Sequence, residues 1–101
     1  MWLKSQLERF VPERCSVIAN VVNKLGLHAR PAMTFVDVAM TFQSAVLVRK
    51  GDTEVDGKSI MQMMMLAASR GCELEIIATG DDAAKTCEAL KKLVDGGFDE
   101  E

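Results

Sequence analysis

Residues 44–56, SAVLVRKGDTEVD, carry the signal that decides the fold. Val46 and Val48 share one face of an alternating, β-branched run, which predicts a strand at the start of this stretch. Lys50-Gly51-Asp52 has the composition of a turn, and residues 53–56 predict a short second strand. The two strands form a hairpin in the middle of the chain.

Two further strands flank this hairpin along the chain. Residues 15–22 and residues 72–79 both alternate in the manner of strands, and the first run is rich in β-branched side chains. In the second run Glu73, Glu75 and Ile77 share one face. This pattern predicts a strand with one side in water.

Three helices separate and follow these strands. The first begins around Pro31, because a missing N–H costs little in the first turn of a helix. The second has Ser59 as its N-cap and ends at Gly71. The third starts at Gly80-Asp81-Asp82, where acids suit the helix dipole, and ends at Gly96-Gly97. The order β-α-β-β-α-β-α predicts an α+β two-layer sandwich with four strands and with the helices on one face.

The length and composition predict one small domain and exclude several function classes. The chain has 101 residues, and twelve basic against fifteen acidic residues give a net charge of −3. This balance argues against a basic nucleic-acid footprint. No apolar run approaches the roughly eighteen residues of a membrane span, and Lys4, Glu8 and Arg9 interrupt any signal-peptide core. We therefore expect no nucleic-acid partner and no membrane insertion.

An N-terminal extension, residues 1–14, precedes the domain, which we place at residues 15–101. Leu3, Leu7 and Phe10 recur at helical spacing, so the extension has the pattern of a short helix. A helix of this length is not stable alone. The pattern leaves open whether the extension packs on the domain, binds a partner or mediates self-association.

The acidic residues concentrate at the other end of the chain. Residues 81–101 hold seven acids and three bases, and the chain ends in Asp99-Glu100-Glu101. Such a tail is most often a solvated end, although its charge could also steer a partner. We expect it to lie in solvent.

The cysteine and histidine content argues against a metal site. Cys15, Cys72 and Cys87 form no CxxC pair, and an odd number of cysteines is a poor disulfide framework. The chain has a single histidine, so a cluster of histidine ligands cannot form. We interpret the cysteines as small buried residues in a reducing cytoplasm, and we expect no metal.

The residues that suggest chemistry lie between the first strand and the first helix. His28 comes just before a helix N-terminus, where free backbone N–H groups and the positive end of the dipole favour an anion. Arg30 adds donors that match phosphate oxygens. A histidine in such a place can accept a phosphoryl group as a nucleophile. A polar residue without a chemical role at a helix start would show the same spacing.

Two motifs in this order resemble the HPr family, the histidine-containing phosphocarriers of the phosphoenolpyruvate-dependent phosphotransferase system. Residues 27–32 read LHARPA and residues 56–61 read DGKSIM, and the resemblance covers residues 15–95. It implies an open-faced sandwich with a four-stranded antiparallel sheet and three helices on one face. It also implies that His28 accepts the phosphoryl group at Nδ1.

The resemblance assigns the phosphate contacts and the partners. Arg30, with the backbone N–H groups of Ala29 and Arg30, would hold the phosphate. Phospho-Enzyme I would be the donor and a IIA-type protein the acceptor, with no organic cofactor. The protein would then be a monomeric carrier with a phosphohistidine intermediate, and not an independent enzyme.

The second motif suggests a regulatory site and a docking patch. The family implies that Ser59 is phosphorylated by an ATP-dependent HPr kinase/phosphorylase, although the residue could also be only a helix cap. Ile60, Met61 and Met64 match the exposed docking patch of the family, whereas Met63 is expected in the core. Core packing of all these methionines is the alternative.

Features of two branches leave the biological role open. Residues 23–26 and 97–101 resemble the nitrogen-branch paralogues, whereas the motif around Ser59 resembles members regulated by the kinase. Phosphoryl flow would therefore serve sugar uptake, regulation or both. The main alternative is a regulatory binding module that acts through Ser59 and the Met-rich patch without transfer by His28. A third hypothesis, an unrelated ligand-binding domain, needs a pocket.

Overall fold

A computed structural model describes residues 13–100, and the predicted extension lies almost entirely outside these residues. The elements follow the predicted order. They are β1 (Arg14–Asn20), α2 (Ala29–Met40), β2 (Ala45–Lys50), β3 (Thr53–Asp56), α3 (Ile60–Met65), β4 (Glu73–Thr79), α4 (Ala83–Asp95) and the 3-10 turn η1 (Gly97–Asp99).

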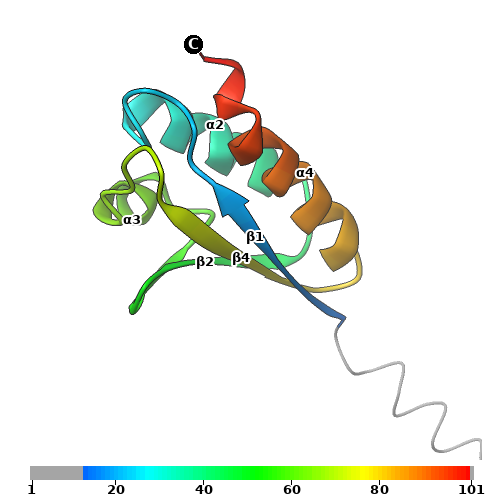
Figure 1. Ribbon diagram of the computed structural model, residues 1–101. Coiled ribbons are helices and arrows are strands. Elements are labelled where there is room, and N and C mark those ends of the chain that lie inside the picture. Colours follow the sequence, from blue (N-terminus) through cyan, green and yellow to red (C-terminus); the bar gives the residue numbers. More distant parts are fainter. Residues whose placement is uncertain (1–12, 101) are drawn as a thin grey trace, which may run out of the picture.

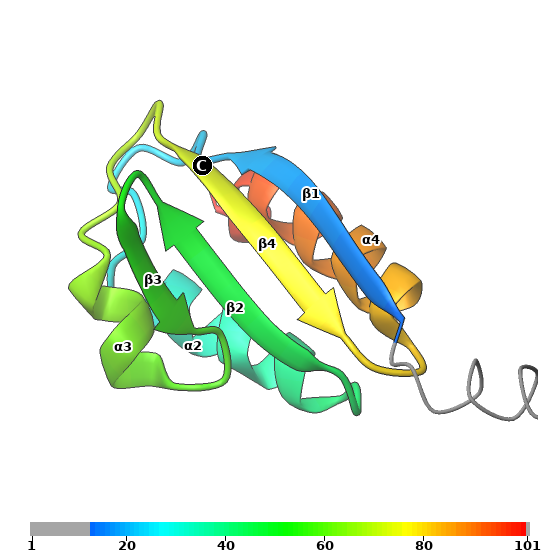
Figure 2. The same ribbon diagram turned by 90° about the horizontal axis from the view of Figure 1, so that it is seen from below.

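The four strands form one antiparallel sheet in the order β1-β4-β2-β3. α2 and α4 cover one face of this sheet, and α3 lies beside β3 and packs against α2 (Figures 1 and 2). The other face is open, as the view from below shows (Figure 2). This arrangement is the predicted α+β open-faced sandwich. Within residues 13–100 no helix is long and apolar enough to cross a membrane.

The core lies between the sheet and the helices. Its largest fully buried side chains include Phe35 from α2, Met63 from α3, Leu74 and Ile76 from β4, and Leu90 from α4. These residues come from four different elements, so the apolar face of each of these elements packs against the others in one core. Met63 is in the core as predicted.

The open face of the sheet carries charged side chains that are exposed to solvent, as predicted for β4. Arg49 pairs with Glu54 at 2.9 Å and with Glu75 at 3.3 Å. Ile77 differs from the prediction, because it is only 4% exposed although it belongs to the same face. It sits on a central strand, with β1 and β2 on either side, so neighbouring side chains cover it.

Helix α3 ends at Met65, well before the predicted end at Gly71. Lys50 Nζ donates to the carbonyl oxygens of Leu66 and Ala67, at 3.1 and 3.3 Å. These contacts satisfy carbonyl groups that a helix end leaves unpaired. Ala67 then takes a left-handed conformation (φ 49°) and the chain leaves the helix axis.

The acid at the start of α4 also makes hydrogen bonds outside its own helix. Asp82 is the N-cap residue, but its side chain does not cap the helix. The carboxylate instead accepts hydrogen bonds from the Ser44 hydroxyl and from the amides of Gln43 and Ser44. The Ser44 hydroxyl is the largest of the causes that lower the pKa of Asp82 from 3.8 to about 2. Asp82 therefore ties α4 to the α2–β2 connection.

Candidate functional site

The loop that carries the predicted histidine is anchored to the α3–β4 connection. The Leu27 amide donates to the Ala68 carbonyl at 2.8 Å, and the Gly71 amide donates to the Val21 carbonyl at 2.8 Å. Gly26 has φ +67°, and a Cβ at this position would lie 2.4 Å from the Ala68 oxygen. A glycine is required there because both the conformation and the close approach exclude a side chain. The loop therefore presents the next residues in a defined position.

His28 is the N-cap residue of α2, with an extended backbone. Its carbonyl accepts from the Ala32 amide at 3.0 Å, but its side chain makes no capping hydrogen bond. The amides of Ala29 and Arg30 lie in the first turn, where no carbonyl of the same helix can pair with them. Pro31 follows them and has no N–H to satisfy. The helix start thus offers two amides next to an imidazole whose side chain is 36% exposed.

The C-terminal tail closes over the same histidine. Glu100 Oε1 lies 3.3 Å from His28 Nε2, and the Glu100 side chain is only 22% exposed. Phe98 and Asp99 take left-handed conformations (φ 58° and 60°), and Phe98 is buried. These turns direct the chain back toward α2. The expectation of a fully solvated tail is wrong at Glu100, because burial of Phe98 pulls the tail onto the domain.

Asn23 connects the tail to the histidine loop. Its side chain is almost fully buried at 3% exposure. Nδ2 donates to the Gly26 carbonyl at 2.6 Å and to Glu100 Oε1 at 3.0 Å. Within the described part of the chain Oδ1 has no hydrogen-bond partner. Asn23 and Glu100 are functional candidates that the sequence interpretation missed, since their contact joins positions 77 residues apart.

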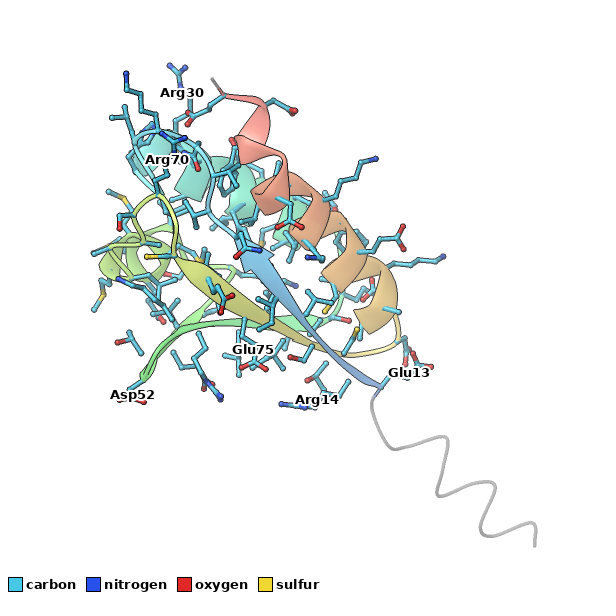
Figure 3. All side chains as sticks on the ribbon, in the orientation of Figure 1. Glu13, Arg14, Arg30, Asp52, Arg70 and Glu75 are labelled. Carbon is cyan, nitrogen blue, oxygen red and sulfur yellow. The ribbon has the colours of Figure 1, made fainter. Side chains whose placement is uncertain are left out.

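Basic side chains lie at the same end of the molecule. Arg30 is exposed in the first turn of α2. Arg70 is exposed in the α3–β4 connection, which the Leu27–Ala68 bond ties to the histidine loop. Figure 3 shows both side chains at the end where α2 begins and the chain terminates. The site thus combines the helix amides with guanidinium groups, and Arg70 is a further residue that no motif in the sequence marks.

Ser59 lies apart from the histidine. It is the N-cap of α3, and its hydroxyl accepts from the Gln62 amide at 3.2 Å. The neighbouring Lys58 Nζ donates to the Phe42 carbonyl at 2.9 Å, just beyond the C-terminal end of α2. His28 lies at the opposite end of α2. The two predicted phosphorylation positions therefore lie at the starts of two different helices, His28 at α2 and Ser59 at α3.

An exposed apolar surface lies on α3. The predicted docking residues are on this surface, with exposures of 38% for Ile60, 78% for Met61 and 45% for Met64. Met65 extends it at 72%. Because α3 packs along α2, this surface and the helix carrying His28 are close neighbours. Further exposed large apolar side chains include Leu25, in the loop before His28, and Met33 and Met40 on α2.

A hollow lies away from the histidine, between α2 and α4. Its volume is about 350 Å³. Its lining comprises Val38, Ala89, Lys92, Leu93, Gly96 and Asp99. His28 is not among these residues.

Comparison with known proteins agrees with this geometry. Residues 16–95 match the family model described as "PTS HPr component phosphorylation site". The chain is 48% identical over 80 residues to the phosphocarrier protein HPr of Neisseria meningitidis serogroup A, which covers 79% of this chain and 90% of the relative. It is 39% identical over 82 residues to the phosphocarrier protein NPr of Proteus mirabilis, covering 80% and 91%.

A solved structure supports the same conclusion. The crystal structure of an HPr from Thermoanaerobacter tengcongensis superposes with a TM-score of 0.82 at 41% identity, and covers 86% of this chain and 98% of that one. The topology, the family model and the curated relatives point to one family. The chain therefore belongs to the HPr family of phosphocarrier proteins of the phosphotransferase system.

Proposed function

We propose that His28 takes a phosphoryl group from phospho-Enzyme I and passes it to a IIA-type protein. The observation that carries this proposal is that the two ring nitrogens of His28 have different surroundings. Nε2 faces Glu100 at 3.3 Å, while the side chain makes no hydrogen bond to the helix start. In the tautomer with the proton on Nε2, Glu100 accepts that proton's hydrogen bond and Nδ1 keeps its lone pair for attack.

The surroundings suit the charge that transfer delivers. Nδ1 forms the new N–P bond as the bond to the donor's histidine breaks. The amides of Ala29 and Arg30 and the guanidinium of Arg30 then face the phosphoryl oxygens. Glu100 holds the proton of the phosphorylated, cationic ring. Transfer to the acceptor reverses the same steps, so the residues of this chain do not need to change their protonation.

Ser59 is proposed as a regulatory phosphorylation site for an ATP-dependent HPr kinase/phosphorylase. Its hydroxyl lies at a helix N-terminus and is partly exposed. A phosphate is tolerated by the helix dipole there, so the domain would stay folded. The added charge would stand beside Ile60 and Met61 and would disfavour a phosphorylated partner on that surface.

The exposed residues Ile60, Met61 and Met64 are proposed to dock both the donor and the acceptor. Methionine side chains adapt to different partners, and this surface lies along the helix that presents His28. We propose that the carrier works as a monomer in the cytoplasm, where unpaired cysteines are stable. One solved HPr from Thermoanaerobacter tengcongensis is described as a dimer, so light scattering at assay concentration checks the monomeric state.

One experiment tests the transfer directly. The protein is incubated with Enzyme I and phosphoenolpyruvate, and intact mass is measured before and after mild acid. We expect one acid-labile phosphoryl group on the wild type and on Ser59→Ala, and none on His28→Ala. Absence of the group on the wild type, with an Enzyme I from the same organism, would overturn the proposal.

The alternative is a regulatory binding module that uses Ser59 and the Met-rich surface alone. Ser59 and His28 cap two different helices, which makes such a separate role feasible. It predicts that His28→Ala keeps function in the cell while Ser59→Ala loses it. The similarity to both HPr and NPr proteins leaves two uses for the carrier, sugar uptake and regulation. Uptake of labelled sugars by a deletion strain distinguishes them.

A further inference from the structure

Two cysteines meet where α4 crosses the beginning of β1. Cys15 is the second residue of β1, and its Cα pairs with Ala78 of β4. Cys87 lies on the buried stripe of α4. The Cys87 thiol donates to the Cys15 carbonyl oxygen at 3.3 Å. Two residues 72 positions apart are thus brought into direct contact by the packing of helix on sheet.

Small side chains surround this contact. Ala78, Ala83 and Cys87 form a separate buried cluster, and Cys15 and Val17 pack against it. Alanines at the interface allow the helix to approach the strand closely. Burial raises the pKa of the Cys87 thiol to about 11, and the neighbouring Cys15 thiol adds to this rise. The hydrogen bond to the Cys15 carbonyl and the shared packing cluster make Cys15 and Cys87 neighbours.

The geometry suits a covalent link. A disulfide needs Cα atoms within about 7 Å and side chains that point toward each other. The Cys87 sulfur already rests against the main chain of Cys15, and rotation of Cys15 about χ1 moves its own sulfur around the same Cα. Closing the bond requires the Cys15 side chain to turn its sulfur toward the Cys87 sulfur.

We propose that Cys15 and Cys87 form a reversible disulfide when the protein meets a peroxide. Cys15 is partly exposed and Cys87 is buried, so peroxide reaches Cys15 first. The Cys15 sulfur attacks the O–O bond, one water leaves, and a sulfenic acid forms. The Cys87 sulfur then attacks the Cys15 sulfur, and the hydroxyl leaves with the Cys87 proton as a second water. The two thiols lose two electrons in total, which the peroxide takes up.

This site is distinct from the phosphoryl-transfer site. Glu13 and Arg14, which directly precede Cys15, lie at one end of the molecule, and Arg30 lies at the other (Figure 3). The disulfide would fasten the first strand to the last helix and would leave the start of α2 open. In a reducing cytoplasm such a bond is expected to form only transiently, as a response to oxidant. A thiol reductant converts it back to two thiols.

Cys72 provides an internal control. It lies at the end of the α3–β4 connection, and its Sγ is 3.6 Å from the Ser69 hydroxyl. The hydrogen bond from Ser69 is the main cause that lowers the pKa of the Cys72 thiol. Cys72 is partly exposed, as Cys15 is, and it has no role in the proposed bond. Its variant separates a specific disulfide from general oxidation.

The full chain is treated with hydrogen peroxide, then unfolded and alkylated with iodoacetamide, and the products are weighed and mapped. We expect oxidised wild type to carry Cys15 and Cys87 in one linked peptide pair, with Cys72 in a separate peptide outside the link. Cys72→Ser forms the same linked pair. Cys15→Ser and Cys87→Ser form no intramolecular link, and circular dichroism confirms that they fold. Dithiothreitol restores all three alkylation sites in the wild type.

Three outcomes would overturn the proposal. These are full alkylation of all cysteines after peroxide, a link that includes Cys72, or a link found only between chains. If both single variants unfold, Cys15→Ala and Cys87→Ala replace them, since alanine already lines this cluster at Ala78 and Ala83. Acid-labile phosphorylation is measured in parallel and is expected to be unchanged by the disulfide, so failure of either proposal is recognised separately.

Discussion

Replacing Asn23 with alanine tests how the histidine loop and the C-terminal tail are held together. Asn23 is 3% exposed, and its Nδ2 serves two acceptors, the Gly26 carbonyl and the Glu100 carboxylate. The variant leaves the Gly26 oxygen short of one donor and releases Glu100. Because Glu100 also faces His28, the same change removes the support behind the proposed phosphoryl acceptor.

The expected loss of stability follows from these contacts. A neutral buried hydrogen bond contributes about 1 kcal/mol, and one to a charged acceptor about 1.5 kcal/mol. Asn23 Oδ1 has no partner among the described residues, so its removal returns about 0.5–1 kcal/mol of desolvation cost. Asn23→Ala should therefore lower the free energy of unfolding by about 2 kcal/mol, or the melting temperature by roughly 10 °C.

Urea unfolding followed by far-ultraviolet circular dichroism measures this difference. A double-mutant cycle with Glu100→Ala isolates the contact between the two side chains, with an expected coupling of about 1 kcal/mol. Asn20→Ala serves as a matched control, because the Asn20 side chain is exposed and only its backbone amide bonds Asp95. A destabilisation below about 0.5 kcal/mol, or zero coupling, would refute the reasoning.

Four other outcomes test the site and its surroundings. Glu100→Ala should slow phosphoryl transfer about fivefold, the cost of one hydrogen bond of about 1 kcal/mol, and Glu100→Gln should restore most of the rate because its amide oxygen can accept the same bond. Arg30→Ala should lower kcat/KM with Enzyme I about tenfold without loss of thermal stability, and an unchanged rate would remove Arg30 from the site. Met61→Glu should raise KM for Enzyme I several-fold, whereas Met65→Glu, equally exposed but outside the predicted patch, should raise it less. Asp82→Asn should lower the free energy of unfolding at neutral pH, and this difference should disappear as pH falls from 3.8 toward about 2. The reason is that a carboxyl group with a lowered pKa stabilises the fold only while it is charged. Equal urea midpoints of variant and wild type at neutral pH would contradict this.

The pattern of the chain predicted the elements well where local signals were strong. The hairpin around Gly51, the N-cap at Ser59 and the buried stripe through Leu90 all appear as expected. The helix after Ser59 was predicted too long. Its apolar run continues past Met65, but contacts to residues distant in the sequence end it, and no local pattern records such contacts.

In the candidate site, too, some features follow from local sequence and others depend on contacts between distant residues. His28 and Arg30 stand two residues apart, so their placement at a helix start follows from local sequence. The contact of Glu100 with His28 spans 72 positions. Asn23, which also bonds Glu100, stands in the sequence as one polar residue in a loop. The composition of the acidic tail predicts only a charged, solvated end, whereas the structure shows that Phe98 is buried and that Glu100 contacts His28.

By itself, the amino-acid sequence determined the order of the elements, the faces that they bury and the position of the histidine at the beginning of a helix. These properties depend on spacing of 2 or about 3.6 residues and on capping, which act over a few neighbouring residues. Only the tertiary structure decided that Glu100 and Asn23 join His28, that Lys58 beside Ser59 reaches the end of α2, and that Cys15 meets Cys87. Each of these contacts joins separate elements, and burial of the shared core sets their distances.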